Sequence, residues 1–262
     1  MQRRHLIAIA AIAMAGLSGF SAQAQTADMK KIRIGVEGAY PPFSEVGKDG
    51  KVMGFEIDLA NAYCAEMKVP CEMVQVDFDG LIPALQARKI DAIIASLSIT
   101  DDRKKAIAFS NPYYNTPARF AGKAGAKMDF SPAGLKGKKI GVQRATIHET
   151  YAAAMFKDSE IVRYATQDQA FLDLKSGRID LTLADLVAID QGFLAKPDGK
   201  GFALVGPVYD DVKYFGTGSG MRKADEKVLG KKFNDAIAAV AANGTFKKLN
   251  DKYFPYDLAP KK

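Results

Sequence analysis

Residues 85–96 read LQARKIDAIIAS, and residues 174–185 read LKSGRIDLTLAD. In each stretch, helically spaced residues give way to an apolar run, which predicts the end of a helix followed by a buried strand. A second pair has the same order, because IRIGV at 32–36 returns as KKIGV at 138–142. The shared composition of α/β units is the alternative explanation, but two echoes in one order favour two domains of similar build.

Strand-like and helix-like segments alternate along the chain. DLANAYCAEMKV at 58–69 has helical spacing, EMVQV at 72–76 is typical of a strand, and FDGLIPALQARK at 78–89 predicts another helix. Strands that alternate with helices of this length form βαβ units and a parallel sheet. Ligands of such sheets bind at the carboxyl ends of the strands.

The chain is predicted to cross between the two domains twice. NPYYNTPARF at 111–120 carries prolines that suit an extended linker, and the glycine-rich VKYFGTGSGMRKADEKV at 212–228 can lead the chain back. We therefore predict an α/β fold of two lobes, each a sheet flanked by helices, joined by two hinge strands. The predicted boundaries are 29–114 with 217–262 for the first lobe, 119–210 for the second, and 115–118 with 211–216 for the hinge.

The N-terminus has the parts of a secretory signal. Arg3 and Arg4 precede an apolar run from Leu6 to Phe20, and small residues follow it up to Ala24. A membrane anchor is the alternative, but the uncharged stretch is short and rich in Ala, Gly and Ser. We therefore predict a signal peptide at 1–24 and a periplasmic location.

Charge and cysteine content narrow the function classes. The formal net charge is +7, and removal of the two signal arginines leaves +5. No Lys/Arg block stands out, so nucleic acid is not an expected partner. Cys64 and Cys71 favour one disulfide in an exported chain. Metal binding is the weaker alternative, because the chain has two histidines and His5 lies in the signal.

The stretch IIASLSITDDRKK at 93–105 predicts an anion site. Thr100 is placed as the N-cap of a helix and Arg103 at its third position, where a cation is unfavourable unless an anion meets it. A guanidinium binds a carboxylate bidentately. Ser96 and Ser98 alternate along the preceding strand, so we expect both hydroxyls on one face. The alternative is an ordinary capped helix with a solvated arginine.

The second lobe is expected to supply an acid, and the first lobe two rings. Asp185 ends the apolar strand IDLTLAD, where it could hold an ammonium or, alternatively, cap the next helix. Tyr40 and Phe78 follow predicted strands, and aromatic faces attract cations, although such rings are often simple core. Glu37 adds a carboxylate beside Tyr40.

Four motifs give the chain a resemblance to a known family. They are GFEIDLANAYC at 54–64, DFDGLIPALQARKIDAIIASLSIT at 77–100, RKKAIAFS at 103–110 and GTFKKLNDKYF at 244–254. With the paired cysteines, they resemble the periplasmic lysine/arginine/ornithine- and histidine-binding proteins, which deliver amino acids to ATP-driven importers. The likeness covers nearly the whole mature chain and implies the two-lobed type II periplasmic binding protein fold.

The resemblance also implies roles for single residues. Arg103 would hold the ligand α-carboxylate with help from Ser98 and from backbone donors near Thr146. Asp185 would pair with the α-ammonium, with Ser96 nearby, while Glu37 would meet the distal cation. The full predicted ligand-binding set is Glu37, Tyr40, Phe78, Ser96, Leu97, Ser98, Arg103, Gln143, Thr146, Ile147, His148 and Asp185.

Some positions depart from the family pattern. Ala95 replaces a serine, and QRATIHE at 143–149 stands where the family usually has LQGST followed by Gln or a similar residue. His148 brings a titratable ring that could contact ligand or adjust affinity with pH. The alternative, a surface histidine or one with a local hydrogen bond, is favoured on frequency.

We expect a monomeric, non-enzymatic binding protein without cofactor or metal. Its predicted ligand is a cationic L-amino acid, with arginine ahead of lysine, ornithine and histidine, and its predicted partner is an inner-membrane ABC permease. Opines or other amino acid derivatives are alternative ligands. A cyclohexadienyl or arogenate-type dehydratase shares the fold and is a further alternative, although no base partner for Glu37 or His148 is evident. A sensor domain is favoured less.

Overall fold

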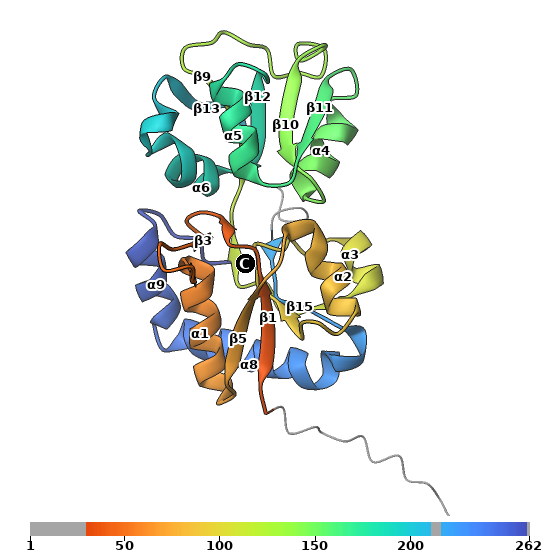
Figure 1. The fold of residues 1–262 in the computed structure, drawn as a ribbon, viewed down its shortest axis with the longest axis vertical. Helices are drawn as coiled ribbons and strands as arrows, with labels where there is room; N and C mark the ends of the chain where they lie inside the picture. Colours follow the sequence, from red (N-terminus) through yellow and green to blue (C-terminus); the bar gives the residue numbers. More distant parts are fainter. Residues whose placement is uncertain (1–29, 211–215, 261–262) are drawn as a thin grey trace, which may run out of the picture.

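The computed structural model describes residues 30–210 and 216–260. The predicted signal peptide and most of the second predicted crossing therefore lie outside the described residues. The chain forms two lobes, each a sheet flanked by helices, as Figure 1 shows. Each of these two sheets has five strands. The predicted two-lobed α/β fold is confirmed.

The first lobe is built on a mixed sheet. Its strand order is β5-β1-β6-β15-β7, with β1 parallel to β5 and β6, and β15 antiparallel to β6 and β7. The strands are β1 (Ile32–Val36), β5 (Cys71–Gln75), β6 (Ala92–Ile93), β7 (Ala108–Phe109) and β15 (Gly220–Met221). The flanking helices are α1 (Phe55–Met67), α2 (Leu81–Gln86), α3 (Asp101–Ala106), α8 (Lys231–Ala242) and α9 (Thr245–Tyr253).

The second lobe has the same plan. Its strand order is β11-β10-β12-β9-β13, with β10 parallel to β11 and β12, and β9 antiparallel to β12 and β13. The strands are β9 (Ala118–Lys123), β10 (Lys139–Gln143), β11 (Glu160–Tyr164), β12 (Leu181–Asp185) and β13 (Phe202–Tyr209). The helices include α4 (Ile147–Met155), α5 (Gln167–Lys175) and α6 (Leu186–Ile189).

The sequence echoes correspond to the same packing in both lobes. A Cβ on Gly35 of β1 would lie 2.4 Å from Ile90 Cδ1, and a Cβ on Gly141 of β10 would lie 2.4 Å from Ile179 Cδ1. Each isoleucine precedes the neighbouring strand and packs against β1 or β10, which therefore needs glycine at this point. The prediction of two units of similar build is confirmed.

Two short sheets lie beside the main ones. The strands β2 (Ala39–Tyr40), β3 (Ser44–Val46) and β4 (Val52–Met53) form an antiparallel ribbon before α1. The strand β8 (Tyr114–Asn115) pairs antiparallel with β14 (Gly216–Thr217). The described parts of the two predicted crossings thus run side by side, while the exact hinge boundaries stay a prediction.

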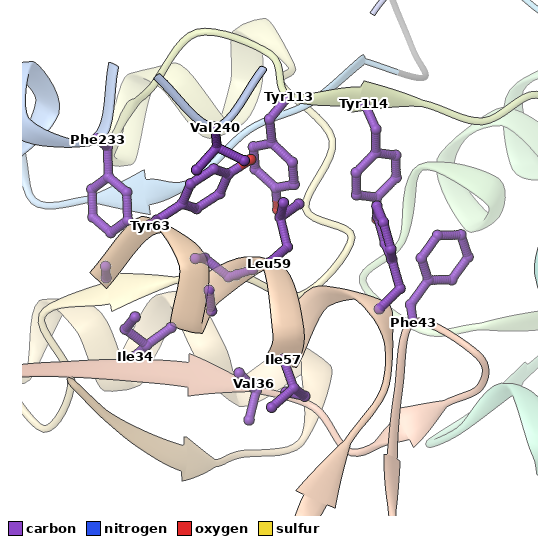
Figure 2. Packing of buried hydrophobic residues seen from close by; sticks show 14 of the residues in the cluster. Ile34, Val36, Phe43, Ile57, Leu59, Tyr63, Tyr113, Tyr114, Phe233 and Val240 are labelled. Atoms are coloured by element: carbon purple, nitrogen blue, oxygen red, sulfur yellow. The ribbon is translucent and has the colours of Figure 1, made fainter. Parts of the chain in front are cut away.

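Aromatic side chains fill the core of the first lobe around α1. Figure 2 shows Tyr63 of α1 beside Tyr113, and Phe43 beside Tyr114. The Phe43 and Tyr114 rings are stacked, with their centroids 5.4 Å apart. The predicted disulfide joins Cys64 of α1 to Cys71 of β5, with Cα atoms 6.1 Å apart. A loop this short stabilises by about 2 to 3 kcal/mol in the chain-entropy treatment.

Across 30–210 and 216–260, no helix combines the length and the apolar character needed to cross a membrane.

Candidate ligand-binding site

A cavity lies between the two lobes. Its walls come mainly from the ends of strands and the starts of helices, where the alternation of strands and helices places a ligand. The lining residues are Glu37, Tyr40, Phe78, Ala95, Ser96, Ser98, Arg103, Gln143, Thr146, Ile147, His148 and Asp185. Eleven of the twelve predicted ligand-binding residues are thus brought together, although their contact with a ligand stays a prediction.

Leu97 is the predicted residue that does not line this cavity. Its side chain is 1% exposed and packs in a hydrophobic cluster with Ile93 and Ile107. The Leu97 side chain points into the core of the first lobe, whereas its neighbours Ser96 and Ser98 line the cavity.

Arg103 provides the positive wall of the cavity. As predicted, Thr100 caps α3, and its hydroxyl accepts from the Arg103 N–H at 3.2 Å. The guanidinium donates to the Ser98 carbonyl at 2.9 Å and, across the lobes, to the Ala145 carbonyl at 2.9 Å. Its carbon lies 5.6 Å from the centre of the Phe78 ring. Two fixed hydrogen bonds therefore orient the fork, and other N–H groups remain for an anion.

The positive charge persists at neutral pH. Burial lowers the pKa of the Arg103 guanidinium to about 10. A cation in this setting attracts a carboxylate more strongly than it would in water. The alternative of an ordinary capped helix with a solvated arginine therefore does not describe Arg103, whose guanidinium donates to two backbone carbonyls.

Asp185 provides an acid on the opposite lobe. It lies at the end of β12 and at the N-cap position of α6, but its side chain makes no capping hydrogen bond. Instead, the Tyr40 hydroxyl of the first lobe donates to Asp185 Oδ2 at 2.7 Å. Burial raises the pKa of the Asp185 carboxyl to about 7. The helix-cap alternative is thus wrong, and a bound cation would favour the ionised form.

Glu37 is a second buried acid and belongs to the first lobe. Its side chain is 4% exposed, and the Gln143 amide of the second lobe donates to it. Burial raises the pKa of the Glu37 carboxyl to about 7. The cavity wall therefore combines one guanidinium with two carboxyls, which matches a ligand with one anionic and two cationic groups.

Ser96 does not have the geometry that the sequence suggested. The strand β6 ends at Ile93, and Ser96 has a φ of 49°, in the left-handed region. The expectation that Ser96 and Ser98 share one strand face is therefore wrong, because the chain turns between them. The cause is Glu56 of α1, whose carboxylate accepts from the Ser96 N–H at 2.8 Å.

The predicted ligand-binding set does not include Glu56 of α1. Its signal was an acid in the otherwise apolar start of GFEIDL, a position that is fully buried in the fold. A charged side chain at such a position needs hydrogen-bond donors, so it predicts a polar neighbour.

The second lobe presents the start of α4 to the cavity. Thr146 caps this helix, its hydroxyl accepting from the Glu149 N–H at 3.2 Å and donating to the Gln143 carbonyl at 2.6 Å. His148 is 5% exposed, with its Nε2 atom 3.8 Å from Asp185 Oδ1. Burial lowers the pKa of the His148 ring to about 3, so the ring is neutral. The surface alternative for His148 is wrong.

An ion pair joins the lobes beside the cavity. Arg144 Nε lies 2.6 Å from Asp79 Oδ2, and the two residues directly follow the cavity residues Gln143 and Phe78. The pair is partly exposed, with side chains 46% and 32% accessible, so we assign it a modest energy.

We expect Arg144→Ala to weaken the binding of every ligand by about two- to fivefold, because the pair holds the closed lobes together without touching ligand. Titration calorimetry at low and high salt would measure the loss, which should shrink as salt screens the pair. Lys231→Ala, which removes an ion pair within α8, is the matched control. A loss that differs between ligands would contradict this role.

Two lobes that enclose a cavity with oppositely charged walls indicate a solute-binding protein, and comparison with known proteins supports this class. The family described as "bacterial extracellular solute-binding proteins, family 3" matches residues 32–256. The chain is 48% identical over 262 residues to the L-arginine-binding protein of Pseudomonas aeruginosa, with 98% of each protein covered.

Two further proteins support the assignment. The chain is 42% identical over 253 residues to the lysine/arginine/ornithine-binding periplasmic protein of Escherichia coli, covering 94% of this chain and 97% of that protein. An ancestral arginine-binding protein, solved with arginine, matches with a TM-score of 0.80 and 35% identity over 86% of this chain and 98% of that one. The chain belongs to family 3 of the bacterial extracellular solute-binding proteins.

Proposed function

We propose that the protein captures a cationic L-amino acid, with arginine as the first choice, between its two lobes and delivers it to an ABC importer in the inner membrane. Arg103 binds the α-carboxylate, Asp185 binds the α-ammonium and Glu37 meets the cation of the side chain. Tyr40 and Phe78 flank the aliphatic part of the ligand. The other cavity residues complete the enclosure.

The observation that carries this proposal is the second buried carboxyl. A neutral amino acid satisfies Arg103 and Asp185 but leaves Glu37 without a cation, and a buried carboxylate whose charge is not compensated is costly. A cationic side chain supplies that partner. The names of two relatives support the same ligand class. The Pseudomonas aeruginosa protein is named for arginine, and the Escherichia coli protein is named for lysine, arginine and ornithine.

The relatives also support a location and a partner for this protein. The Escherichia coli relative is named as periplasmic, and the family is described as extracellular. We propose a periplasmic, monomeric protein that an inner-membrane permease recognises. The lobes close when one ligand contacts both of them, since a ligand shifts such an equilibrium only through contacts that it gains in the closed form.

Glu37→Gln tests the ligand class. We expect about tenfold weaker binding of arginine and lysine, because a charge-assisted hydrogen bond becomes a neutral one, and equal or tighter binding of glutamine, because no carboxyl is then left without a cation. Thermal shift with the twenty amino acids, ornithine, citrulline and opines ranks the ligands, and calorimetry gives the affinities. Equal losses for glutamine and arginine would contradict the assignment of Glu37.

The matched control is Glu45→Gln on β3, which removes the carboxylate of a residue that pairs in register with Ala39 and does not line the cavity. The same panel separates the alternatives. A larger shift with opines than with any amino acid would assign the derivative-binding function instead. Conversion of arogenate or prephenate to an aromatic product would assign a dehydratase, whereas we propose binding without chemistry.

A further inference from the structure

Glu56 is a buried carboxylate that does not line the ligand cavity. Its side chain is fully buried at the start of α1. The Ser96 N–H donates to both of its oxygens at 2.8 Å, and the Ser96 hydroxyl donates to Oε2 at 3.1 Å. The Tyr113 hydroxyl donates to Oε1 at 2.9 Å. Such a concentration of donors is typical of a carboxylate that must be held in its ionised form.

Burial acts in the opposite direction and raises the pKa of the Glu56 carboxyl. The backbone N–H of Ser96 is a donor that cannot accept, however, so the oxygens facing it must act as acceptors. The hydroxyl groups of Ser96 and Tyr113 can rotate so that they too donate to Glu56. The backbone N–H of Ser96 therefore determines the hydrogen-bond pattern around Glu56.

This pattern determines what the Ser96 hydroxyl can do. A hydroxyl has one proton and two acceptor lone pairs. The Ser96 proton goes to Glu56, and the Tyr114 hydroxyl donates to Ser96 Oγ at 2.8 Å. One acceptor position remains, and Ser96 lines the cavity. Toward a ligand, Ser96 can therefore accept a hydrogen bond but cannot donate one.

The surroundings of Ser96 favour a cation as its partner. Asp185 lines the same cavity, and the charge of Glu56 contributes to raising the pKa of Asp185, so the two acids act on one region. Residues other than glycine rarely adopt the left-handed backbone of Ser96. The hydrogen bond from the Ser96 N–H to Glu56 holds that conformation. Tyr113 and Tyr114 extend from the first crossing toward α1, as Figure 2 shows, and the Tyr113 hydroxyl also donates to Glu56.

We propose that Glu56 is a positioning residue that fixes Ser96 as a second acceptor, beside Asp185, for the α-ammonium of the ligand. Through Ser96, Glu56 lets the site distinguish an α-amino acid from the same compound without its amino group. The inference rests on the proposed function, because it concerns the ammonium of the amino acid that the cavity is proposed to bind.

The experiment compares L-arginine with 5-guanidinopentanoate, which has hydrogen in place of the α-ammonium. Calorimetry gives the affinity ratio of the two ligands for each variant. In Glu56→Gln the new amide can donate to Ser96 Oγ and occupy its acceptor position. We expect arginine to bind about tenfold more weakly, with less than twofold change for the analogue.

Two further variants keep the result interpretable. Tyr113→Phe removes a donor from Glu56 without touching Ser96 and should leave the ratio unchanged. Ser96→Ala removes the hydroxyl and should lower the ratio as Glu56→Gln does, even if Glu56→Gln does not fold. In the Ser96→Ala background, Glu56→Gln should have no further effect on the ratio.

Each outcome decides the inference. Equal losses for both ligands in Glu56→Gln would reduce Glu56 to a structural role and overturn it, as would an unchanged ratio in Ser96→Ala. A further fall of the ratio in the double variant would also overturn it. A wild-type protein that fails to bind cationic amino acids would instead contradict the proposed function, before any variant is compared.

Discussion

Arg103→Ala is expected to weaken arginine binding about a hundredfold or more. The substitution leaves the ligand carboxylate without its guanidinium inside a closed cavity, and the loss of one partner from a buried charge pair costs about 3 to 5 kcal/mol. It also removes the hydrogen bond from Arg103 to the Ala145 carbonyl across the lobes. Titration calorimetry with arginine, lysine and glutamine measures the effect, which should be similar for all three ligands.

Two variants on α3 control this result. Lys104→Ala removes the neighbouring cation, which pairs with Asp101 at 3.5 Å on the helix surface, and should leave affinity unchanged. Arg103→Lys keeps the charge but loses the planar fork, so we expect an intermediate loss. Binding by Arg103→Ala that is as tight as in the parent protein would remove Arg103 from the site.

Asp185→Asn should produce the second large effect, a loss of about fiftyfold or more for every α-amino acid. The shape of the side chain is kept, so the hydrogen bond from Tyr40 can persist, while the charge that holds the α-ammonium disappears. Calorimetry with arginine measures the loss. An analogue without the α-ammonium should lose little, and equal losses for both would contradict the assignment.

The same variant provides a pH readout. When the lobes are closed, burial raises the pKa of the Asp185 carboxyl to about 7, so this group is mainly neutral below pH 7. A bound ammonium requires the ionised form, so a ligand that binds between the closed lobes displaces this proton, and its binding weakens as pH falls from 8 to 6. We expect this dependence in the parent protein and a reduced one in Asp185→Asn, where Glu37 alone contributes. A pH-independent affinity would contradict the mechanism.

The predictions from sequence succeeded where the deciding interactions are local. The Thr100 cap and the position of Arg103 follow from four consecutive residues, and the capping hydrogen bond is formed within them. The repeated sequence of β1 and β10 contains a glycine at the same place, because a neighbouring isoleucine leaves no room for a side chain there. Such a requirement is visible in the sequence as a repeated pattern. The family resemblance extended these local signals to the cavity.

The failures depended on contacts between distant segments. Ser96 turns into the left-handed region because Glu56, forty positions earlier, accepts from its N–H. No propensity of the segment itself predicts that turn. Arg144 pairs with Asp79 only because the lobes bring them together, and the burial of His148 likewise depends on tertiary packing. These features require the three-dimensional structure.

The two buried acids also disfavour closure of the lobes around an empty site. If the lobes separate, Glu37 and Asp185 meet water, where a carboxyl group is ionised at neutral pH. Shutting without cargo would force each acid to take up a proton or to lose its hydration, since burial raises both pKa values to about 7. Above neutral pH, the closed conformation would therefore be populated mainly by the occupied protein. A permease that recognises this conformation would rarely engage the empty protein.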